Sequence, residues 1–348
     1  MSDNAKIISV ATAVPKYKLQ QNDIENLAAG LFGQSLGDFA RLAPIYKNSA
    51  IDIRYSCVPL EWYSEPTTFS ERNRLYQENA VELLAEAGNK ALGQANMSFD
   101  DIDGLVVVSS SGIATPSLDA LLIEKLHLKS NMERLPIFGL GCVGGVLGLA
   151  RTAQLARGAP EKRYLYMVVE LCGLDFINSD LTKSNVIATA LFADGASAAV
   201  IACKGEGPAI LGWGEHTWPD SLDVMGWDVT DKGLSVIFSK DIPSIVRKDM
   251  RQVVDSFLQE HKIDKSEIVE FLSHPGGAKV LDAIQDAMDI PAGHLYHARE
   301  TLRNYGNMSA ATVMFVLEAG LRDVARGYYL LSSFGPGFTA GMVLLEVS

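Results

Sequence analysis

Residues 135–158 read LPIFGLGCVGGVLGLARTAQLARG. An apolar run over 135–140 leads into Gly141 and Cys142, and the apolar residues then recur with helical spacing at Val146, Leu149, Ala150 and Ala153. Gly158 and Pro160 end that pattern, as glycine and proline commonly end helices. This stretch predicts a strand, a tight turn and a helix in direct succession, with Cys142 at the start of the helix.

The surroundings of Cys142 suit a reactive thiol. Gly141, Gly144 and Gly145 allow a tight turn and the close approach of a substrate. The dipole and free amides at a helix N-terminus favour a thiolate, and they can donate to a carbonyl oxygen that becomes negative during acyl transfer. The alternative is a small buried cysteine in a glycine-rich turn.

The pattern of the 135–158 segment continues along the chain, where short apolar runs alternate with helical patterns. Several of the runs are nearly continuous Val, Ile and Leu, which is typical of strands covered on both faces. We expect strands at 7–10, 105–108, 164–169, 198–202, 209–213, 268–273, 328–334 and 342–347. We expect helices at 73–92, 118–126, 143–157, 245–259, 277–288 and 309–324. The alternation predicts an α/β fold with a mixed or parallel sheet in layers.

The chain also shows a weak internal symmetry. In each half a strand leads to a loop with a reactive residue type, then to a helix and a late pair of strands. The segment KGEGP at 204–208 is a natural break between the halves. We therefore expect an N-terminal half over 1–207, which carries Cys142, and a C-terminal half over 208–348.

Composition restricts the functional classes. The chain has 348 residues, of which 48% are hydrophobic, so it can bury a large core and is expected to form two sub-domains. A formal net charge of -12 argues against nucleic acid or an anionic membrane as the main partner. The four cysteines form no CxxC pair, which disfavours a metal site or a disulfide framework. Without a signal-peptide pattern or a long apolar stretch, a cytoplasmic location is expected.

A cysteine nucleophile usually works with a histidine that is distant in sequence. Of six histidines, His274 alone ends an apolar strand pattern, in EFLSHPGG, where α/β sites gather. Asn307, in NYGNMS, precedes the expected final helix. Its side chain is either an N-cap or an amide that donates to a thioester carbonyl, and His274 taken alone could be a core residue.

These three segments together resemble the type III polyketide synthases, the chalcone synthase-like family. GLGCVGG (139–145) resembles the nucleophile motif, LSHPGGAKVLDA (272–283) the histidine motif and NYGNMSAATVMFVLE (304–318) the asparagine motif. ALFADGASAAV (190–200) and SSFGPGFTAGMVLLE (332–346) resemble the family's LFGDGA and GFGPG segments. The segments at 109–120 and 225–229 are similar to bacterial members in particular.

The resemblance implies a thiolase fold, with two similar βαβ-type halves packed in αβαβα layers, and a homodimer without carrier protein, cofactor or metal. It implies that acyl-CoA loads Cys142, that malonyl-CoA is decarboxylated to extend the chain, and that the product cyclises to a pyrone, resorcinol or phloroglucinol type. His274 would pair with the thiolate and, with Asn307, stabilise the enolate. Two aimed donors in a dry pocket are well suited to that charge.

The family's substrate-binding positions match this sequence with two departures. Phe192 matches a gatekeeper phenylalanine, whereas the second gatekeeper position holds the smaller Val236. Asp175 stands where a small uncharged residue is usual, and a buried carboxylate there would oppose a long apolar starter. Further substrate-binding positions implied by the resemblance are Thr115, Ser309, Gly335, Pro336 and Gly337.

Two other expectations come from the resemblance. The Thr115–Pro116 bond is predicted to be cis, in a turn near the cavity of a dimer partner. Lys279, Arg41 and Lys47 match or lie near positions that bind the phosphates of coenzyme A, although Arg41 and Lys47 could simply belong to a solvated helix face.

Two rival functions share part of this pattern. A ketoacyl synthase III that uses an acyl carrier protein has the same fold and the same Cys-His-Asn set. A non-catalytic thiolase-like scaffold that binds acyl-CoA or a partner protein is the alternative of another class. The GFGPG-like and NYGNMS segments favour the polyketide family over the first rival, and the presence of all three reactive residues argues against the second.

Overall fold

A computed structural model describes residues 4–33, 39–291, 293–322 and 325–348. Its main feature is a nine-stranded sheet in the order β11-β12-β13-β8-β1-β7-β6-β4-β5. Its strands are β1 (Lys6–Ala13), β4 (Gly104–Val108), β5 (Glu133–Ile137), β6 (Arg163–Leu171), β7 (Asp194–Ala202), β8 (Ala209–Thr217), β11 (Ile268–Ser273), β12 (Gly327–Gly335) and β13 (Thr339–Val347). All eight expected strands occur, most of them longer than predicted, and the fold is mixed α/β as expected.

The two halves of the sheet meet at a narrow seam between β1 and β8. These strands pair at a single position, Lys6 opposite Ala209. Next to it, the Ile7 amide donates to the Pro208 carbonyl at 3.0 Å. Within the first half β4 is parallel to β5 and β6, and in the second half β11 is parallel to β12. The division at 207/208 falls at this seam and stays a proposal, because one sheet runs through both halves.

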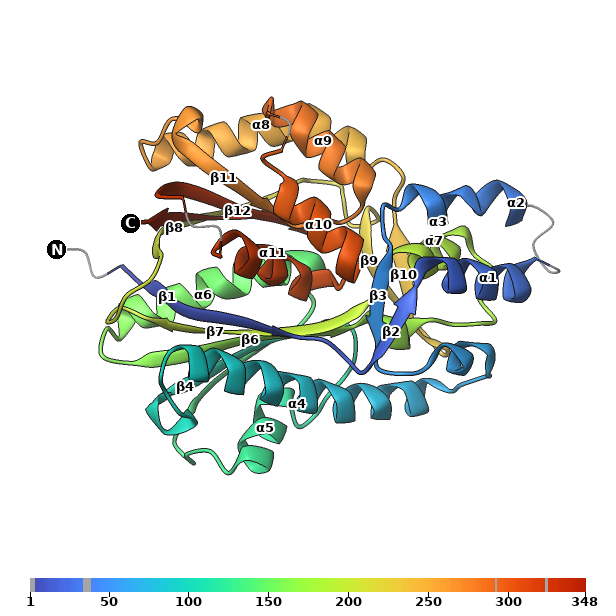
Figure 1. Cartoon of the computed structure of the whole chain (residues 1–348), viewed down its shortest axis with the longest axis horizontal. Helices are drawn as coiled ribbons and strands as arrows, with labels where there is room; N and C mark the ends of the chain where they lie inside the picture. The colour runs from blue at the N-terminus through green and yellow to red at the C-terminus, as the bar shows by residue number, and fades with distance from the viewer. Residues whose placement is uncertain (1–3, 34–38, 292, 323–324) are drawn as a thin grey trace.

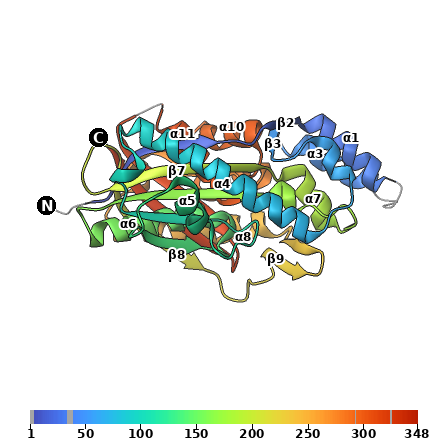
Figure 2. The same ribbon diagram turned by 90° about the horizontal axis from the view of Figure 1, so that it is seen from below.

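Helices separate and cover the two halves in five layers (Figure 1). The outer faces are covered by α4 (Phe69–Gln94) and α5 (Leu118–Leu126) on one side, and by α8 (Ile242–Glu260) and α9 (Ala278–Met288) on the other. Between the halves lie α6 (Gly144–Gly158) and α11 (Thr312–Gly320). Figure 2, seen from below, shows α4 and α5 in front of the sheet. This is the predicted αβαβα arrangement.

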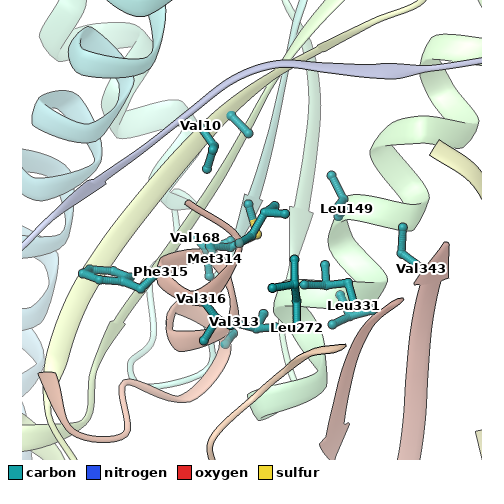
Figure 3. Packing of buried hydrophobic residues seen from close by; sticks show 14 of the residues in the cluster. Val10, Leu149, Val168, Leu272, Val313, Met314, Phe315, Val316, Leu331 and Val343 are labelled. Atoms are coloured by element: carbon teal, nitrogen blue, oxygen red, sulfur yellow. The ribbon is translucent and has the colours of Figure 1, made fainter. Parts of the chain in front are cut away.

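The two central helices are packed against strands of both halves, which explains why they are apolar on most sides. Figure 3 shows Leu149 of α6 and Met314 of α11 among side chains such as Val168 and Leu331. These four side chains are fully buried, and burying each stabilises the fold by about 1.5–3 kcal/mol. At Gly145 a Cβ atom would lie 2.2 Å from a backbone oxygen near the start of α11, so only glycine allows this approach. The N-termini of α6 and α11 are thereby held together.

The expected helix over 309–324 is shorter in the structure. It consists of the 3-10 turn η6 (Ser309–Ala311) followed by α11, which ends at Gly320, and residues 323 and 324 lie outside the described residues. The Thr115–Pro116 bond is cis, as predicted. In the described part of the chain no helix is both long and apolar enough to cross a membrane.

A cap at one end of the layers was missed in the sequence. It comprises α1 (Gln21–Phe32), α2 (Phe39–Leu42), α3 (Pro44–Asn48), α7 (Lys183–Leu191), the strand pair β2 (Tyr17–Gln20) and β3 (Ile53–Ser56), and the hairpin β9 (Met225–Thr230) and β10 (Gly233–Phe238). The helix α10 (Tyr296–Tyr305) lies beside α11. Short elements of this kind carry little periodic signal. Phe32, Tyr46 and Val186 of α7 belong to one buried hydrophobic cluster within the cap.

Candidate active site

Cys142 lies in η3 (Gly141–Val143), the turn between β5 and α6. Its side chain is 8% exposed, and the thiol donates a hydrogen bond to the Ser309 hydroxyl with 3.4 Å between Sγ and Oγ. The Ser333 hydroxyl donates to the Cys142 carbonyl at 2.8 Å. Gly141 has a φ of +49°, and a Cβ there would lie 2.6 Å from Cδ of Pro336. The loop that contains Pro336 therefore packs directly against the cysteine turn.

The electrostatic state of Cys142 differs from the expectation. Burial raises the pKa of the thiol to about 12. The hydrogen bond with Ser309 and a backbone hydrogen bond act in the opposite direction, and the nearby Glu170 raises the pKa further. Removal from water thus outweighs the helix amides, which were predicted to favour the thiolate. In this structure burial favours the protonated thiol.

His274 directly follows the last residue of β11. Its backbone amide donates to the Ser332 carbonyl at 2.8 Å, and the neighbouring Ser333 binds Cys142. The imidazole is 4% exposed, and neither ring nitrogen has a hydrogen-bond partner among the described residues. Burial lowers its pKa to about 3, which favours the neutral ring. A buried polar group without a partner costs about 1–3 kcal/mol, so this imidazole is poised to bind something else.

Asn307 combines the two roles considered for it. Its Oδ1 accepts from the Ser309 amide at 2.9 Å, which resembles a helix cap, and its Nδ2 donates to the Gly276 carbonyl at 3.1 Å. Gly276 lies two residues after His274. Hydrogen bonds therefore connect Cys142 through Ser309 and Asn307 to the loop that carries His274.

Phe192 is tied to Asn307 through the backbone. The two residues form an isolated parallel bridge, in which the Asn307 amide donates to the Leu191 carbonyl and the Ala193 amide donates to the Asn307 carbonyl, both at 2.9 Å. Phe192 follows the last residue of α7. The bridge fixes this aromatic side chain beside the segment that presents the candidate catalytic amide.

Cys142 lines one cavity, which adjoins a second and larger one. The smaller has about 370 Å³ of free space, part of it open to solvent, and its lining includes Cys142, Ser309 and Pro336. The larger has about 790 Å³, part of it open to solvent, and extends to the apolar face of α1. Four residues line both cavities: Cys172, Phe192, Trp227 and Val236. An acyl group on Cys142 would pass these residues to enter the larger cavity.

Asp175 lines the larger cavity in η4 (Cys172–Asp175). Its Oδ2 has no hydrogen-bond partner among the described residues. Burial raises its pKa well above the usual range, as do the charges of Glu170 and Asp194, while Arg72 lowers it. Because these effects favour the protonated form, the objection to an apolar chain beside Asp175 is weaker than the sequence indicated.

The remaining residues predicted to bind substrate or coenzyme A lie in different parts of the molecule. Gly335 ends β12, where a Cβ would lie 2.5 Å from the Leu140 carbonyl oxygen, and Gly337 has a φ of +74° in the following turn. Thr115 is exposed and does not line either cavity of its own chain. The predicted phosphate-binding residues are all exposed: Lys279 in the first turn of α9, Arg41 on α2 and Lys47 on α3.

Three buried charged residues near the site were missed. Glu170 accepts from the Ser110 amide at 3.0 Å, and burial raises its pKa to about 7. Asp194 lies in β7, and Arg54 in β3 donates to the Phe192 carbonyl. Glu170 could have been predicted as a buried charged residue, because it stands at the end of an apolar run. The sequence around Arg54 contains no such feature. Among the described residues no three His, Cys, Asp or Glu side chains form a metal-binding group.

Comparison with known proteins gives a consistent result over the whole chain. The family models for chalcone and stilbene synthases match residues 2–205 with the N-terminal domain and 214–348 with the C-terminal domain. A putative chalcone synthase of Bacillus subtilis is 37% identical, with 98% of each chain covered. A 1,3,6,8-tetrahydroxynaphthalene synthase of Streptomyces peucetius is 34% identical, with 98% of this chain and 92% of that protein covered.

The fold agrees equally well with solved structures. The crystal structure of 1,3,6,8-tetrahydroxynaphthalene synthase from Streptomyces coelicolor, a bacterial type III polyketide synthase, superimposes with a TM-score of 0.94 at 26% identity. The match covers 98% of this chain and 99% of that one. The arrangement of Cys142, His274 and Asn307 described above therefore lies within a fold shared with condensing enzymes.

Proposed function

Because the chain belongs to the chalcone and stilbene synthase family of type III polyketide synthases, we propose that it condenses malonyl-CoA with a starter acyl-CoA held on Cys142. The observation that carries the assignment of residues is the hydrogen-bonded connection from Cys142 through Ser309 and Asn307 to the His274 loop. It joins three distant segments in one buried network, of which Cys142 and Ser309 line a cavity.

In the first step the acyl group is loaded. His274 takes the thiol proton of Cys142, and the sulfur attacks the carbonyl carbon of the starter thioester. The bond between that carbon and the sulfur of coenzyme A breaks, and coenzyme A leaves with the proton from His274. The acyl group now forms a thioester on Cys142. The unpartnered, neutral ring of His274 is suited to receive and return this proton.

The second step forms the carbon–carbon bond. Malonyl-CoA loses CO2, and the electron pair of the broken bond gives an enolate whose charge lies on the thioester oxygen. An N–H of His274 and the Asn307 amide stabilise that oxygen, an effect for which a single donor is typically worth about 10²–10³-fold in rate. The enolate carbon then attacks the acyl carbonyl, and the Cys142 thiolate leaves. Repeated rounds and cyclisation would give a pyrone, resorcinol or phloroglucinol type of product.

We further propose that the larger cavity holds the starter end of the chain. The starter is the part of a growing chain most distant from Cys142, so it must lie beyond Phe192 and Val236. Asp175 contributes the polar wall of that space. For coenzyme A we propose Lys279, Arg41 and Lys47 as phosphate-binding residues, because the three carry exposed positive charge.

A homodimer and a cytoplasmic location complete the proposal. A surface hollow of about 830 Å³ lies beside Thr115, and its rim includes Phe138 and Ile113, which are 62% and 41% exposed. Exposed apolar side chains at a hollow are typical of contact surfaces. This supports a dimer in which Thr115 approaches the partner's cavity.

The decisive experiment is to incubate the protein with malonyl-CoA and a panel of acyl-CoA starters, and to identify products and protein adducts by mass spectrometry. We expect the acyl adduct on Cys142, and Cys142→Ala should abolish condensation. Cys172→Ala is the matched control, since Cys172 lines both cavities but should carry no acyl group. An adduct mainly on Cys57, Cys172 or Cys203 would contradict the proposal. Turnover that requires a carrier protein would favour the ketoacyl synthase rival.

A further inference from the structure

A buried arginine in the cap contacts the backbone that presents Asn307. Arg54 lies on β3, and its side chain is only 4% exposed. Its Nη1 donates to the Phe192 carbonyl at 2.7 Å. The bridge between Phe192 and Asn307 uses the neighbouring Leu191 carbonyl and Ala193 amide, so the Phe192 carbonyl is available to Arg54. The guanidinium therefore holds one side of this bridge.

The aliphatic part of Arg54 holds the other side. Gly306, the residue before Asn307, has a φ of +72°. A Cβ at Gly306 would lie 2.7 Å from Cγ and 2.9 Å from Cδ of Arg54. Only a glycine therefore fits between this side chain and the asparagine segment. One arginine therefore donates to Phe192 through its charged end and lies with its stem against Gly306, the residue before Asn307.

Burial lowers the pKa of Arg54 to about 10, and the nearby charge of Asp194 acts in the opposite direction. Asp194, two residues after Phe192, accepts from the Cys57 amide at 2.9 Å and the Gly173 amide at 2.7 Å. Burial raises the pKa of Asp194 to about 6, while these hydrogen bonds and the charge of Arg54 act to lower it. A buried cation is costly unless an opposite charge and hydrogen bonds offset its lost hydration, and the charge of Asp194 and the Phe192 carbonyl do so in part.

Arg54 is one of the residues that line the larger cavity. Its Nε and Nη2 have no hydrogen-bond partner among the described residues, and each exposes less than 1 Å². These two nitrogens are covered, and the cavity is bordered by other atoms of the side chain. The geometry thus favours an effect on the backbone over direct binding of the substrate.

We propose that Arg54 is a positioning residue that fixes the Asn307 amide for decarboxylation and condensation. The inference rests on the function proposed above, in which loading of Cys142 needs His274 and the later steps also need Asn307. Cys142 is held by Ser309 and Ser333, which Arg54 does not contact through any described hydrogen bond. Loss of Arg54 should therefore impair the second step more than the first.

The test compares the two steps in Arg54→Met, which keeps an unbranched stem but removes the donors. Acylation of Cys142 by a starter acyl-CoA is followed by mass spectrometry, and CO2 release from malonyl-CoA is measured separately. We expect CO2 release to fall about 10²-fold, the effect of a displacement near 1 Å at a reacting centre, while acylation stays near the wild-type rate. Arg54→Lys, which keeps one charged donor, should restore part of the loss.

Arg157→Met is the matched control for a general loss of stability. Arg157 is a half-buried arginine in the last turn of α6. Its Nη2 donates to the Ile210 carbonyl at 2.6 Å and to the Leu211 carbonyl at 3.0 Å. Its loss should lower the temperature of unfolding without changing the ratio of CO2 release to acylation. Both steps falling in equal proportion in Arg54→Met, or CO2 release unchanged, would overturn the proposal.

Two further outcomes are distinguishable. If Arg54→Met does not fold, Arg54→Lys decides the question: a lower ratio of CO2 release to acylation than in the wild type supports the proposal, and an unchanged ratio overturns it. A wild-type protein that neither becomes acylated on Cys142 nor releases CO2 from malonyl-CoA contradicts the proposed function, whatever the Arg54 variants do.

Discussion

The Cys142 thiol donates its hydrogen bond to the Ser309 hydroxyl, with 3.4 Å between Sγ and Oγ. This contact needs no charge on the sulfur. In the proposed pair of Cys142 and His274, burial favours the neutral form of each side chain. It raises the pKa of Cys142 to about 12 and lowers that of His274 to about 3. A lone buried charge is expensive, but a proton passed from one group to the other gives two charges that offset each other. The reactive thiolate should therefore depend on His274.

Replacing His274 by glutamine tests this dependence. Without the imidazole, the thiol keeps the raised pKa that burial imposes, so the thiolate fraction at pH 7 falls and the rate of alkylation by iodoacetamide falls with it. The rate should then rise steadily as the pH approaches about 12, the pKa of the buried thiol. Alkylation is measured from pH 5 to 10 and assigned to Cys142 by mass spectrometry. His216→Gln, at an exposed position, is the control. Identical pH profiles for wild type and His274→Gln would show that the histidine does not take the proton.

Asn307→Asp should separate loading from condensation. The substitution replaces a donor by an acceptor that faces the Gly276 carbonyl, and it removes the amide that would stabilise the enolate. We expect CO2 release from malonyl-CoA to fall about 10²–10³-fold, whereas Cys142 should still become acylated. Asn304→Asp is the control, because its Nδ2 donates to the Glu300 carbonyl within α10. Equal loss of acylation and CO2 release in Asn307→Asp would assign the residue a structural role only.

Val236 is expected to restrict the passage between the two cavities. It lines both, and it lies opposite Trp227 in the β9–β10 hairpin. A phenylalanine at this position would narrow the way to the larger cavity, so kcat/KM for long acyl-CoA starters should fall more than for short ones. Val229→Phe, on the same hairpin at a position that is 72% exposed, should leave the preference unchanged. A uniform decrease for all chain lengths would argue against a passage at Val236.

The layers of the fold could be predicted because the central strands are nearly continuous apolar runs. Strands such as β6 and β7 are buried on both faces, so their sequence shows their position directly. The cap could not be predicted in this way. Its elements are short and partly exposed, and β3 is determined by pairing with β2 and by contacts with segments distant in sequence. Local patterns do not contain that information.

The residues of the candidate site likewise fall into those that the sequence could suggest and those that it could not. Cys142, His274 and Asn307 could be proposed because glycine-rich turns surround them at strand and helix ends and because their three segments together resemble one family, and their catalytic roles stay a prediction. Arg54 could not, since its contact with the Phe192 carbonyl joins residues separated by 138 positions. The raised pKa of Cys142 was also missed, because the helix amides are visible in the sequence and the degree of burial is not.

Asp175 should make the stability of the protein depend on pH. Burial raises the pKa of its carboxyl group, followed by the charges of Glu170 and Asp194, and only Arg72 acts against them. The folded state therefore holds this proton more tightly than the unfolded state, in which the pKa is about 3.9. Above that pH the unfolded state binds fewer protons than the folded state, so the free energy of unfolding decreases as the pH rises.

Asparagine at position 175 keeps the shape of the side chain and cannot lose a proton in this range. The experiment measures the unfolding temperatures of Asp175→Asn and of the wild type. The unfolding temperature of the variant minus that of the wild type should increase as the pH is raised from 5 to 8. Glu170, whose pKa burial raises to about 7, contributes with the same sign in both proteins, and its charge above that pH holds the Asp175 proton still more tightly in the wild type. Asp228→Asn, at an exposed position on β9, should show no such trend. A difference that is constant with pH would mean that Asp175 is already ionised at pH 5, and that Arg72 outweighs burial in the cavity wall.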